Sequence, residues 1–237
     1  MNPSKRGIGT AVKAGAVVLL IILGLATIYL LPKFSSSSQS QGPSSNPGAQ
    51  PVTGMPSLFY DFTRMSLAVD VNDQVDGYVQ NQTYSYTVLG KGTLNSTVYT
   101  RVEFTTVDEG NNIVIWYNPT GGIGEVDVVG VRNYTGNGTV NLPFITTYTQ
   151  SFGALVSISN NSTLLSLLTK TSEVVTSIGP TKMDVTTYLL PGRSYPYTAL
   201  TLKLATIPGT TAVLATYLDE KTTDGSTTLL EVTSLTR

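Results

Sequence analysis

Residues 84–88 read YSYTV, residues 101–106 read RVEFTT and residues 200–204 read LTLKL. In each stretch, large apolar side chains stand at alternate positions, with polar side chains between them. A period of two places the apolar side chains on one face of a β-strand and the polar ones on the other. Thr, Val and Tyr, which suit a pleated and half-buried surface, are frequent around all three stretches. We therefore predict a mainly β protein.

Short turn signals separate these stretches along the chain. Combinations of Gly with Asp, Asn or Pro are typical of the turns in β-hairpins. They occur at Asp76-Gly77, Glu109-Gly110-Asn111-Asn112, Pro119-Thr120-Gly121-Gly122, Gly136-Asn137-Gly138, Pro208-Gly209 and Asp224-Gly225. Their spacing predicts about ten strands, joined mostly as antiparallel hairpins.

Leucines at helical spacing interrupt the strand pattern about two-thirds of the way along the chain. Ser162 is a suitable N-cap for a helix there. The apolar face of that helix consists of Leu164, Leu165, Leu167 and Leu168. Residues 152–158 show a second helical pattern. The fold class that we expect is one antiparallel, curved sheet with one or two short helices.

The order of these elements resembles the LolA/LppX type of fold. Most of the likeness lies between Tyr84 and Val128, which reads strand, the sequence LGKG at 89–92, strand, turn, a strand at 113–118 and a glycine turn. The resemblance implies a strongly curved sheet that wraps over a helix and encloses an apolar cavity. A β-sandwich and a pair of small β-subdomains satisfy the same alternation, so both alternatives stay open.

The start of the chain contains a membrane-spanning pattern. Residues 14–31 read AGAVVLLIILGLATIYLL, which is 18 consecutive residues without a charge. As a helix this segment is about 27 Å long, close to the hydrocarbon thickness of a bilayer. Pro32 ends the helix. We predict a cytoplasmic tail over residues 1–13 and a transmembrane signal anchor over residues 14–32.

Basic residues orient the predicted span. Lys5, Arg6 and Lys13 precede it, whereas Lys33 alone follows it closely. The positive-inside rule therefore places the N-terminus in the cytoplasm and the C-terminal domain outside the cell membrane. Lys5-Arg6 followed by Gly7 also resembles the prepilin-type signal of archaeal pilins and of some archaeal binding proteins, which implies cleavage after Gly7. The alternative is that these charges only anchor the chain.

Two regions follow the span. Residues 33–56 are rich in Ser, Gly, Pro and Gln, and residues 35–56 carry no charge. Such a composition buries too little apolar surface to fold, so we predict a disordered stalk. Residues 57–237 then form one extracellular β-rich domain. This domain holds 10 basic and all 15 acidic residues, a net charge of −5, and no basic stripe, so no nucleic-acid partner is expected.

Six N-x-S/T sequons lie in the predicted extracellular domain. They are Asn81, Asn95, Asn133, Asn137, Asn160 and Asn161. We expect about three or more of them to carry a glycan in a host that performs N-glycosylation. Asn133 and Asn137 are the foremost candidates because they flank a Gly-rich turn. The alternative is that these residues only form turns.

Residues for common catalytic mechanisms are missing. The chain has no Cys and no His, which excludes thiolate nucleophiles, disulfides, the Ser-His-Asp triad, and imidazole or thiolate metal sites. Asp70, Asp73 and Asp76 do not follow EF-hand spacing, and the sequence DGS at 224–226 reverses the aspartic-protease order. Both patterns are typical of turns. We expect no enzymatic activity, no cofactor and no metal.

Aromatic and apolar side chains are the remaining candidates for ligand contacts. Trp116, the single tryptophan, is followed by Tyr117 in a predicted strand. Together with Phe104 and Leu202, these residues are our candidates for lining an apolar ligand. Cross-strand packing in the core is the alternative explanation.

The composition as a whole points to the cell surface. Charged residues make up 12% of the chain, about half of the usual fraction. With the sequons and the absence of His and Cys, this composition resembles membrane-anchored, N-glycosylated cell-surface proteins of thermoacidophilic archaea. The resemblance implies a surface of hydroxyls, amides and glycans that stays solvated in acid, where carboxylates lose their charge.

Two functions from different classes follow. The first is a non-enzymatic, membrane-anchored extracellular domain that binds a lipid or other apolar ligand in a cavity on the order of 300 Å³ or more. The alternative is a structural or adhesion component of the cell envelope, such as an accessory subunit of a surface layer or filament. Its partner would be an envelope protein, bound at an exposed patch or an open sheet edge.

Overall fold

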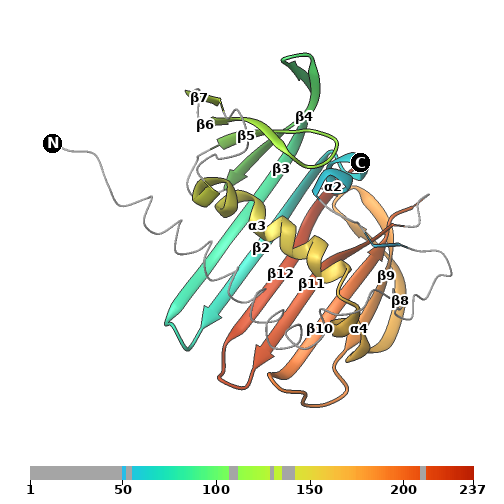
Figure 1. Ribbon diagram of the computed structural model, residues 1–237. Coiled ribbons are helices and arrows are strands. Elements are labelled where there is room, and N and C mark those ends of the chain that lie inside the picture. The colour runs from blue at the N-terminus through green and yellow to red at the C-terminus, as the bar shows by residue number, and fades with distance from the viewer. Residues whose placement is uncertain (1–49, 52–54, 107–111, 129–130, 135–141, 209–211) are drawn as a thin grey trace, which may run out of the picture.

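The computed structural model describes residues 50–51, 55–106, 112–128, 131–134, 142–208 and 212–237. The helices are α2 (Met55–Asp61), α3 (Leu142–Ser159) and α4 (Ser162–Ser166). The strands are β1 (Gln50–Pro51), β2 (Arg64–Asp73), β3 (Tyr78–Leu94), β4 (Thr97–Thr106), β5 (Asn112–Tyr117), β6 (Ile123–Val128), β7 (Val131–Tyr134), β8 (Thr169–Ile178), β9 (Thr181–Leu189), β10 (Tyr197–Thr206), β11 (Ala212–Thr222) and β12 (Thr227–Thr236). Figure 1 shows these strands side by side in one sheet, with α3 lying across it.

The twelve strands in the described part of the chain all belong to one sheet. Eleven of them pair antiparallel in the order β7-β6-β5-β4-β3-β2-β12-β11-β10-β9-β8, and β1 adds to β11 in parallel. Each half of the sheet is a meander of consecutive hairpins, and the halves meet where β2 pairs with β12. The prediction of a single, mainly antiparallel sheet is confirmed, and the sandwich and two-subdomain alternatives are wrong.

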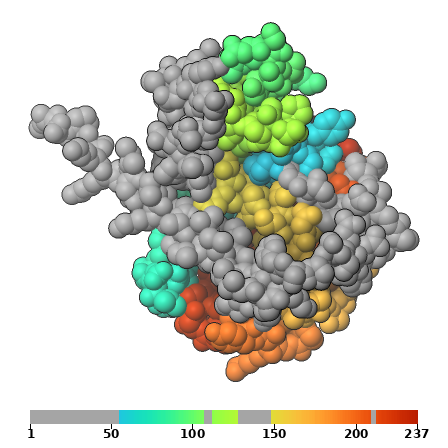
Figure 2. Space-filling model, viewed as in Figure 1, coloured from blue at the N-terminus to red at the C-terminus, as the bar shows by residue number. Residues whose placement is uncertain are grey.

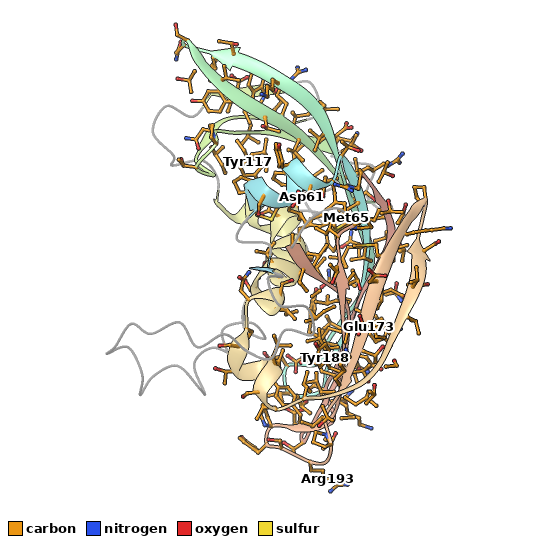
Figure 3. All side chains as sticks on the ribbon, turned by 90° about the vertical axis from the view of Figure 1, so that its right-hand side faces the viewer. Asp61, Met65, Tyr117, Glu173, Tyr188 and Arg193 are labelled. Carbon is orange, nitrogen blue, oxygen red and sulfur yellow. The ribbon has the colours of Figure 1, made fainter. Side chains whose placement is uncertain are left out.

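The sheet is curved, and the helices occupy its concave side. Seen from the side in Figure 3, the strands bend around α3. In the space-filling view of Figure 2, α3 lies at the centre of the concave side, between the green strands above and the orange strands below. Contacts of α3 with β11, β4 and β2 tie both halves of the sheet to the same helix. This layout, a curved sheet over a helix, is the one that the LolA/LppX resemblance implied.

Five buried rings, which we call the aromatic cluster, attach α2 and α3 to the sheet: Phe59, Tyr86, Phe104, Tyr117 and Phe152. The ring centroids of Phe59 and Tyr86 are 5.0 Å apart, and those of Tyr86 and Phe152 are 5.1 Å apart, both in edge-to-face arrangements. Each such ring buries roughly 150–250 Å². The aromatic cluster therefore forms a packed core under the two helices.

The helices differ from the prediction. Helix α3 has 18 residues, against the expected 152–158, and α2 was not predicted. Thr and Ser are frequent in α3 and its sequence holds no charge, so packing on the sheet rather than helix propensity stabilises it. The N-cap of α4 is Asn161, whose Oδ1 accepts a hydrogen bond from Leu164 N at 2.9 Å, whereas Ser162 is the first helical residue.

The glycine-rich stretch 89–92 also differs from the prediction, because it does not separate two strands. Strand β3 continues through it to Leu94, with a register shift between Val88 and Gly90. Gly90 has φ +99°, a backbone conformation that favours glycine. A β-bulge of this kind bends a strand without ending it, and β3 therefore runs for 17 residues along both the concave core and the outer hairpin.

Several predictions concern residues outside the described part of the chain. These are the cytoplasmic tail 1–13, the span 14–32, the cleavage site after Gly7 and most of the stalk 33–56. In the described part of the chain, no helix combines the length and hydropathy needed to cross a bilayer. Within the predicted stalk, Gln50–Pro51 form β1 and Met55 begins α2, so folded structure starts before residue 57.

Candidate functional site

A row of five buried residues crosses the concave side, one on each of five neighbouring strands. The strand register places them opposite one another in the order Leu200, Glu220, Thr228, Val71 and Gln80. Directly opposite residues in antiparallel strands project from the same face. Glu220 is 4% exposed, and Thr228 and Gln80 are each 7% exposed. We call Glu220, Thr228 and Gln80 the polar row.

The neighbouring row toward the helices is almost entirely apolar. The register places Tyr188, Leu202, Leu218, Leu230, Val69 and Gln82 opposite one another. All of them except Gln82 are buried. We call the five buried members, Tyr188, Leu202, Leu218, Leu230 and Val69, the apolar band. Tyr188, labelled in Figure 3, lies in the lower half of the sheet, whereas Tyr117 of the aromatic cluster lies in the upper half.

Glu220 is the chemically most unusual member of the polar row. Burial raises the pKa of this carboxyl to about 7, a hydrogen bond with Thr228 opposes the shift, and the neighbouring Asp219 adds to it. The protonated form of Glu220 is therefore favoured far more than that of an exposed glutamate. In its protonated form the carboxyl is a hydrogen-bond donor as well as an acceptor.

Gln80, at the other end of the polar row, belongs to a hydrogen-bond chain along β3. Its Nε2 donates to the hydroxyl of Tyr84 at 2.6 Å, and that hydroxyl donates to Oε1 of Gln82 at 2.9 Å. The Tyr78 hydroxyl donates to Oε1 of Gln80 at 3.1 Å, and burial raises the pKa of Tyr78 to about 12. These contacts hold neutral donors and acceptors at fixed positions on the concave side.

The four predicted ligand-lining residues do not lie together. Phe104 and Tyr117 belong to the aromatic cluster and are covered by Phe59 of α2. Leu202 belongs to the apolar band. Trp116 projects from the opposite face, because consecutive residues of a strand point to opposite sides of the sheet. Only three of the four therefore share the concave side.

Trp116 has a fixed environment on the convex side. Its Nε1 donates to Oδ2 of Asp127 at 3.2 Å, and the guanidinium carbon of Arg101 lies 5.5 Å from the ring centroid. The ring of Tyr99 is 6.4 Å away in an edge-to-face arrangement. With 8% of its surface exposed, Trp116 acts as a packed cross-strand residue, the alternative stated in the sequence analysis.

The sequons occupy different local structures. Asn81 is exposed within β3, and Asn95 is exposed in the β3–β4 turn with φ +47°. Asn133 lies in β7, and Asn137 lies outside the described residues. Asn160 donates from Nδ2 to Val156 O at 2.7 Å, and the next residue is the N-cap of α4. A glycan is attached through Nδ2, which in Asn160 already donates to the helix backbone, whereas Asn81 and Asn95 are exposed in a strand and a hairpin turn.

The aspartates that were predicted to lie in turns accept hydrogen bonds from backbone amides of the same turns. Oδ1 of Asp73 accepts hydrogen bonds from Val75 N and Asp76 N, and Oδ1 of Asp224 accepts one from Ser226 N. Hydrogen bonds from Thr222 and Ser226 lower the pKa of Asp224. Within the described ranges, no group of three acidic side chains is placed to hold a metal ion. The DGS sequence at 224–226 is a hairpin turn.

Comparisons with known proteins add little. No protein-family model matches the chain, and no curated protein matches it. Among solved structures, a "putative lipoprotein" from Parabacteroides distasonis is similar at 11% identity, over 78% of this chain and 96% of that chain, with a TM-score of 0.21. At this TM-score and identity the likeness implies neither a shared fold nor a shared function.

Sequence reasoning did not find the polar row. Its members lie far apart in the chain, and the strand order that joins β3 to β11 through β2 and β12 is needed to bring them together. One signal was present: Glu220 follows Leu218 at the two-residue spacing of one strand face. A glutamate at an inward position of such a strand marks a site that needs an explanation.

Proposed function

We propose that this protein is a membrane-anchored, extracellular, non-enzymatic binding domain for an amphipathic, mainly apolar ligand held on the concave side of the sheet. The observation that carries the proposal is the polar row, three buried polar residues placed directly beside the apolar band. Polar side chains are seldom buried at inward positions of a sheet, and the carboxyl, hydroxyl and amide groups of these three can form further hydrogen bonds beyond those described above. A ligand with an apolar body and a polar end matches both rows.

The chemistry of the polar row defines the polar end of the ligand. A protonated Glu220 donates a hydrogen bond, and the neutral Gln80 and Thr228 both donate and accept. None of the three contributes a positive charge, so a phosphate or sulfate head group lacks a counterion. The row therefore favours an uncharged hydroxyl, ester, amide or protonated carboxyl group on a lipid.

The predicted transmembrane anchor would hold the binding domain at the outer surface of the membrane. With the N-terminus inside and residues 33–49 as a tether, the domain would stand close to the outer membrane surface and exchange lipid with it. Supports for this arrangement are the uncharged run at 14–31 and the basic residues before it. Catalysis is not part of the proposal, because the chain offers no nucleophile–base pair that includes Cys or His.

The test uses the full chain, purified in detergent and labelled with a photoactivatable palmitic acid analogue. We expect cross-links to the apolar band, around residues 200–202, 218–220 and 228–230, and competition by unlabelled palmitic acid. Native mass spectrometry of the protein from its own membrane should show a lipid-sized adduct of one per chain. Cross-links confined to residues 14–31 together with an adduct-free protein would reject the proposal.

A matched pair of variants tests the polar row itself. Glu220→Gln keeps the shape of the side chain but removes its titration, whereas Asp219→Asn changes the exposed neighbour on the other face of β11. Labelling of the original chain should weaken between pH 6 and pH 8, as Glu220 ionises. Glu220→Gln should remove that pH dependence and Asp219→Asn should keep it. An unchanged pH profile in Glu220→Gln would exclude Glu220 from the site.

A further inference from the structure

Strand β8 ends the described sheet and is unusually exposed. It has ten residues, TKTSEVVTSI, and the first nine are exposed on both faces. Val174 is 53% exposed and Val175 is 71% exposed. Its neighbour β9 pairs with it along one side, and no other strand in the described part of the chain pairs along the other. Glu173, labelled in Figure 3, lies on this outermost strand.

The composition of β8 does not protect this edge. Sheet edges are usually blunted by proline, by inward-pointing charges or by short strands. Strand β8 contains no proline, is rich in β-branched residues, and holds two charges of opposite sign, Lys170 and Glu173, which form an ion pair with each other. The edge is therefore long, neutral and suited to pairing with another strand.

We propose that β8 pairs with β8 of a second copy of this chain, in an antiparallel, two-fold symmetric arrangement. The sequence TSEVVTS at 171–177 is nearly self-complementary when Val174 stands opposite its own copy. In that register Ser172 faces Thr176, Thr171 faces Ser177, and Glu173 faces Val175 of the other chain. Hydroxyl pairs and β-branched pairs are favourable cross-strand neighbours.

Charge disfavours one of the two neighbouring two-fold registers. Moving the pairing by one residue along each strand, so that Glu173 faces its own copy, places two carboxylates directly opposite each other, which is unfavourable. With Val174 at the two-fold axis, no like charges face each other, and Lys170 faces Ile178. A two-fold contact of this kind closes on itself and leaves no further edge on β8, so it yields a dimer and no filament.

The partner could instead be an extended segment of a different envelope protein. The self-complementarity of residues 171–177 favours the second copy, because a foreign strand would need no such symmetry. The pairing extends the alternative function considered from the sequence, an envelope component that acts through an open sheet edge. It does not depend on the proposed ligand, since the polar row and β8 lie at different places on the sheet.

The chain has no cysteine, so single cysteines report the register directly. We expect full-length Val174→Cys to form a disulfide-linked dimer when oxidised with copper phenanthroline, because directly opposite Cα atoms lie within disulfide range. Val175→Cys is the matched control on the same strand. It is the more exposed residue, so random collision would favour it, but in the proposed register its copies are displaced by two residues.

Cross-linking of Val174→Cys should be about tenfold faster than that of Val175→Cys or of the remote, exposed Val79→Cys. Native mass spectrometry should show a dimer of the unmodified chain, and the double variant Val174→Lys with Val175→Lys should be monomeric with an unchanged circular dichroism spectrum. Equal rates for the three cysteine variants, or a monomer of the unmodified chain at micromolar concentration, would overturn the proposal.

Discussion

The indole ring of Trp116 lies directly on the backbone of Gly92. A Cβ atom at residue 92 would be 2.6 Å from Cζ3 and 2.9 Å from Cη2 of the ring. The same relationship occurs between Tyr99 and Gly124, where a Cβ atom would be 2.4 Å from Cε1. In both cases one strand lies between the ring and the glycine, β4 in the first and β5 in the second, so the aromatic side chain reaches across it and supplies the packing that the glycine lacks.

Gly92→Ala should therefore displace the indole ring and lower the free energy of unfolding by about 1–3 kcal/mol. Because Trp116 is the single tryptophan, its fluorescence should shift to longer wavelength as the ring leaves its contact with Asp127 and Arg101. Gly192→Ala is the control, since a Cβ there meets nothing within 4 Å. A Gly92→Ala protein with unchanged emission and stability would show that the ring does not rest on the glycine.

Ser159 joins the end of α3 to β11. Its hydroxyl donates to Leu155 O at 2.6 Å and accepts a hydrogen bond from Ala215 N at 2.7 Å, in a fully covered position. Ser159→Ala should leave the amide of Ala215 without a partner and cost about 1–3 kcal/mol. Ser157→Ala, exposed on the same helix, should be neutral in the same urea titration. Equal stability of the two variants would contradict this role.

Glu220 should make the domain more stable in acid than at neutral pH. The folded state raises the pKa of Glu220 from 4.5 to about 7, so it binds this proton more tightly than the unfolded chain does. The resulting stabilisation is complete below pH 4.5 and is lost as pH rises through 7. The difference is on the order of 3 kcal/mol.

Glu220→Gln should remove this dependence, and its urea midpoint should exceed that of the original chain at pH 8. Asp219→Asn, which removes the smallest of the contributions to the raised pKa of Glu220, should keep the pH dependence and move its midpoint only slightly to lower pH. Reversible unfolding of the original chain near pH 3 with full stability at pH 7 would contradict both this prediction and the acid-adapted surface inferred from the composition.

Glycan occupancy should depend on the local structure around each acceptor asparagine, exposed in a strand or hairpin turn for Asn81 and Asn95 and tied to a helix end for Asn160. In a host that N-glycosylates, glycopeptide mass spectrometry should find Asn81 and Asn95 occupied, and Asn95→Gln should remove one glycan mass. Asn160 should be poorly occupied, because its Nδ2 already donates to Val156 O and a glycan there would crowd the start of α4. Full occupancy of Asn160 with an empty Asn95 would reverse this order.

The alternation of apolar and polar residues was sufficient to predict which side chains of an individual strand are buried. Tyr84 and Tyr86, Val102 and Phe104, and Leu200 and Leu202 all point inward as their alternation predicts, since a strand has only two faces. The same rule separates Trp116 from Tyr117, so their joint assignment to one ligand cavity neglected a signal that was present. The two-residue period therefore predicts which face of a single strand is buried, but it does not predict which strands are neighbours.

Features that depend on strand order could not be predicted in this way. The polar row needs β2 to pair with β12, and nothing local in residues 64–73 or 227–236 indicates that pairing. The length of α3 was also missed, because its packing on the sheet overrides the weak helix propensity of its Thr and Ser residues. Strand β8, exposed on both faces, shows no alternation to detect.

The pairing of β2 with β12 has a consequence for how the protein is made. Strand β2 cannot pair with β12 until residues 227–236 have been synthesised and have left the ribosome. Until then, the half-sheet β2–β7 has an unpaired edge at β2. Contacts of such long sequence separation fold slowly and expose strand edges meanwhile. A chain cut short by only its final strand would thus have two unpaired edges in the middle of its sheet, and such chains are natural targets for quality-control proteases.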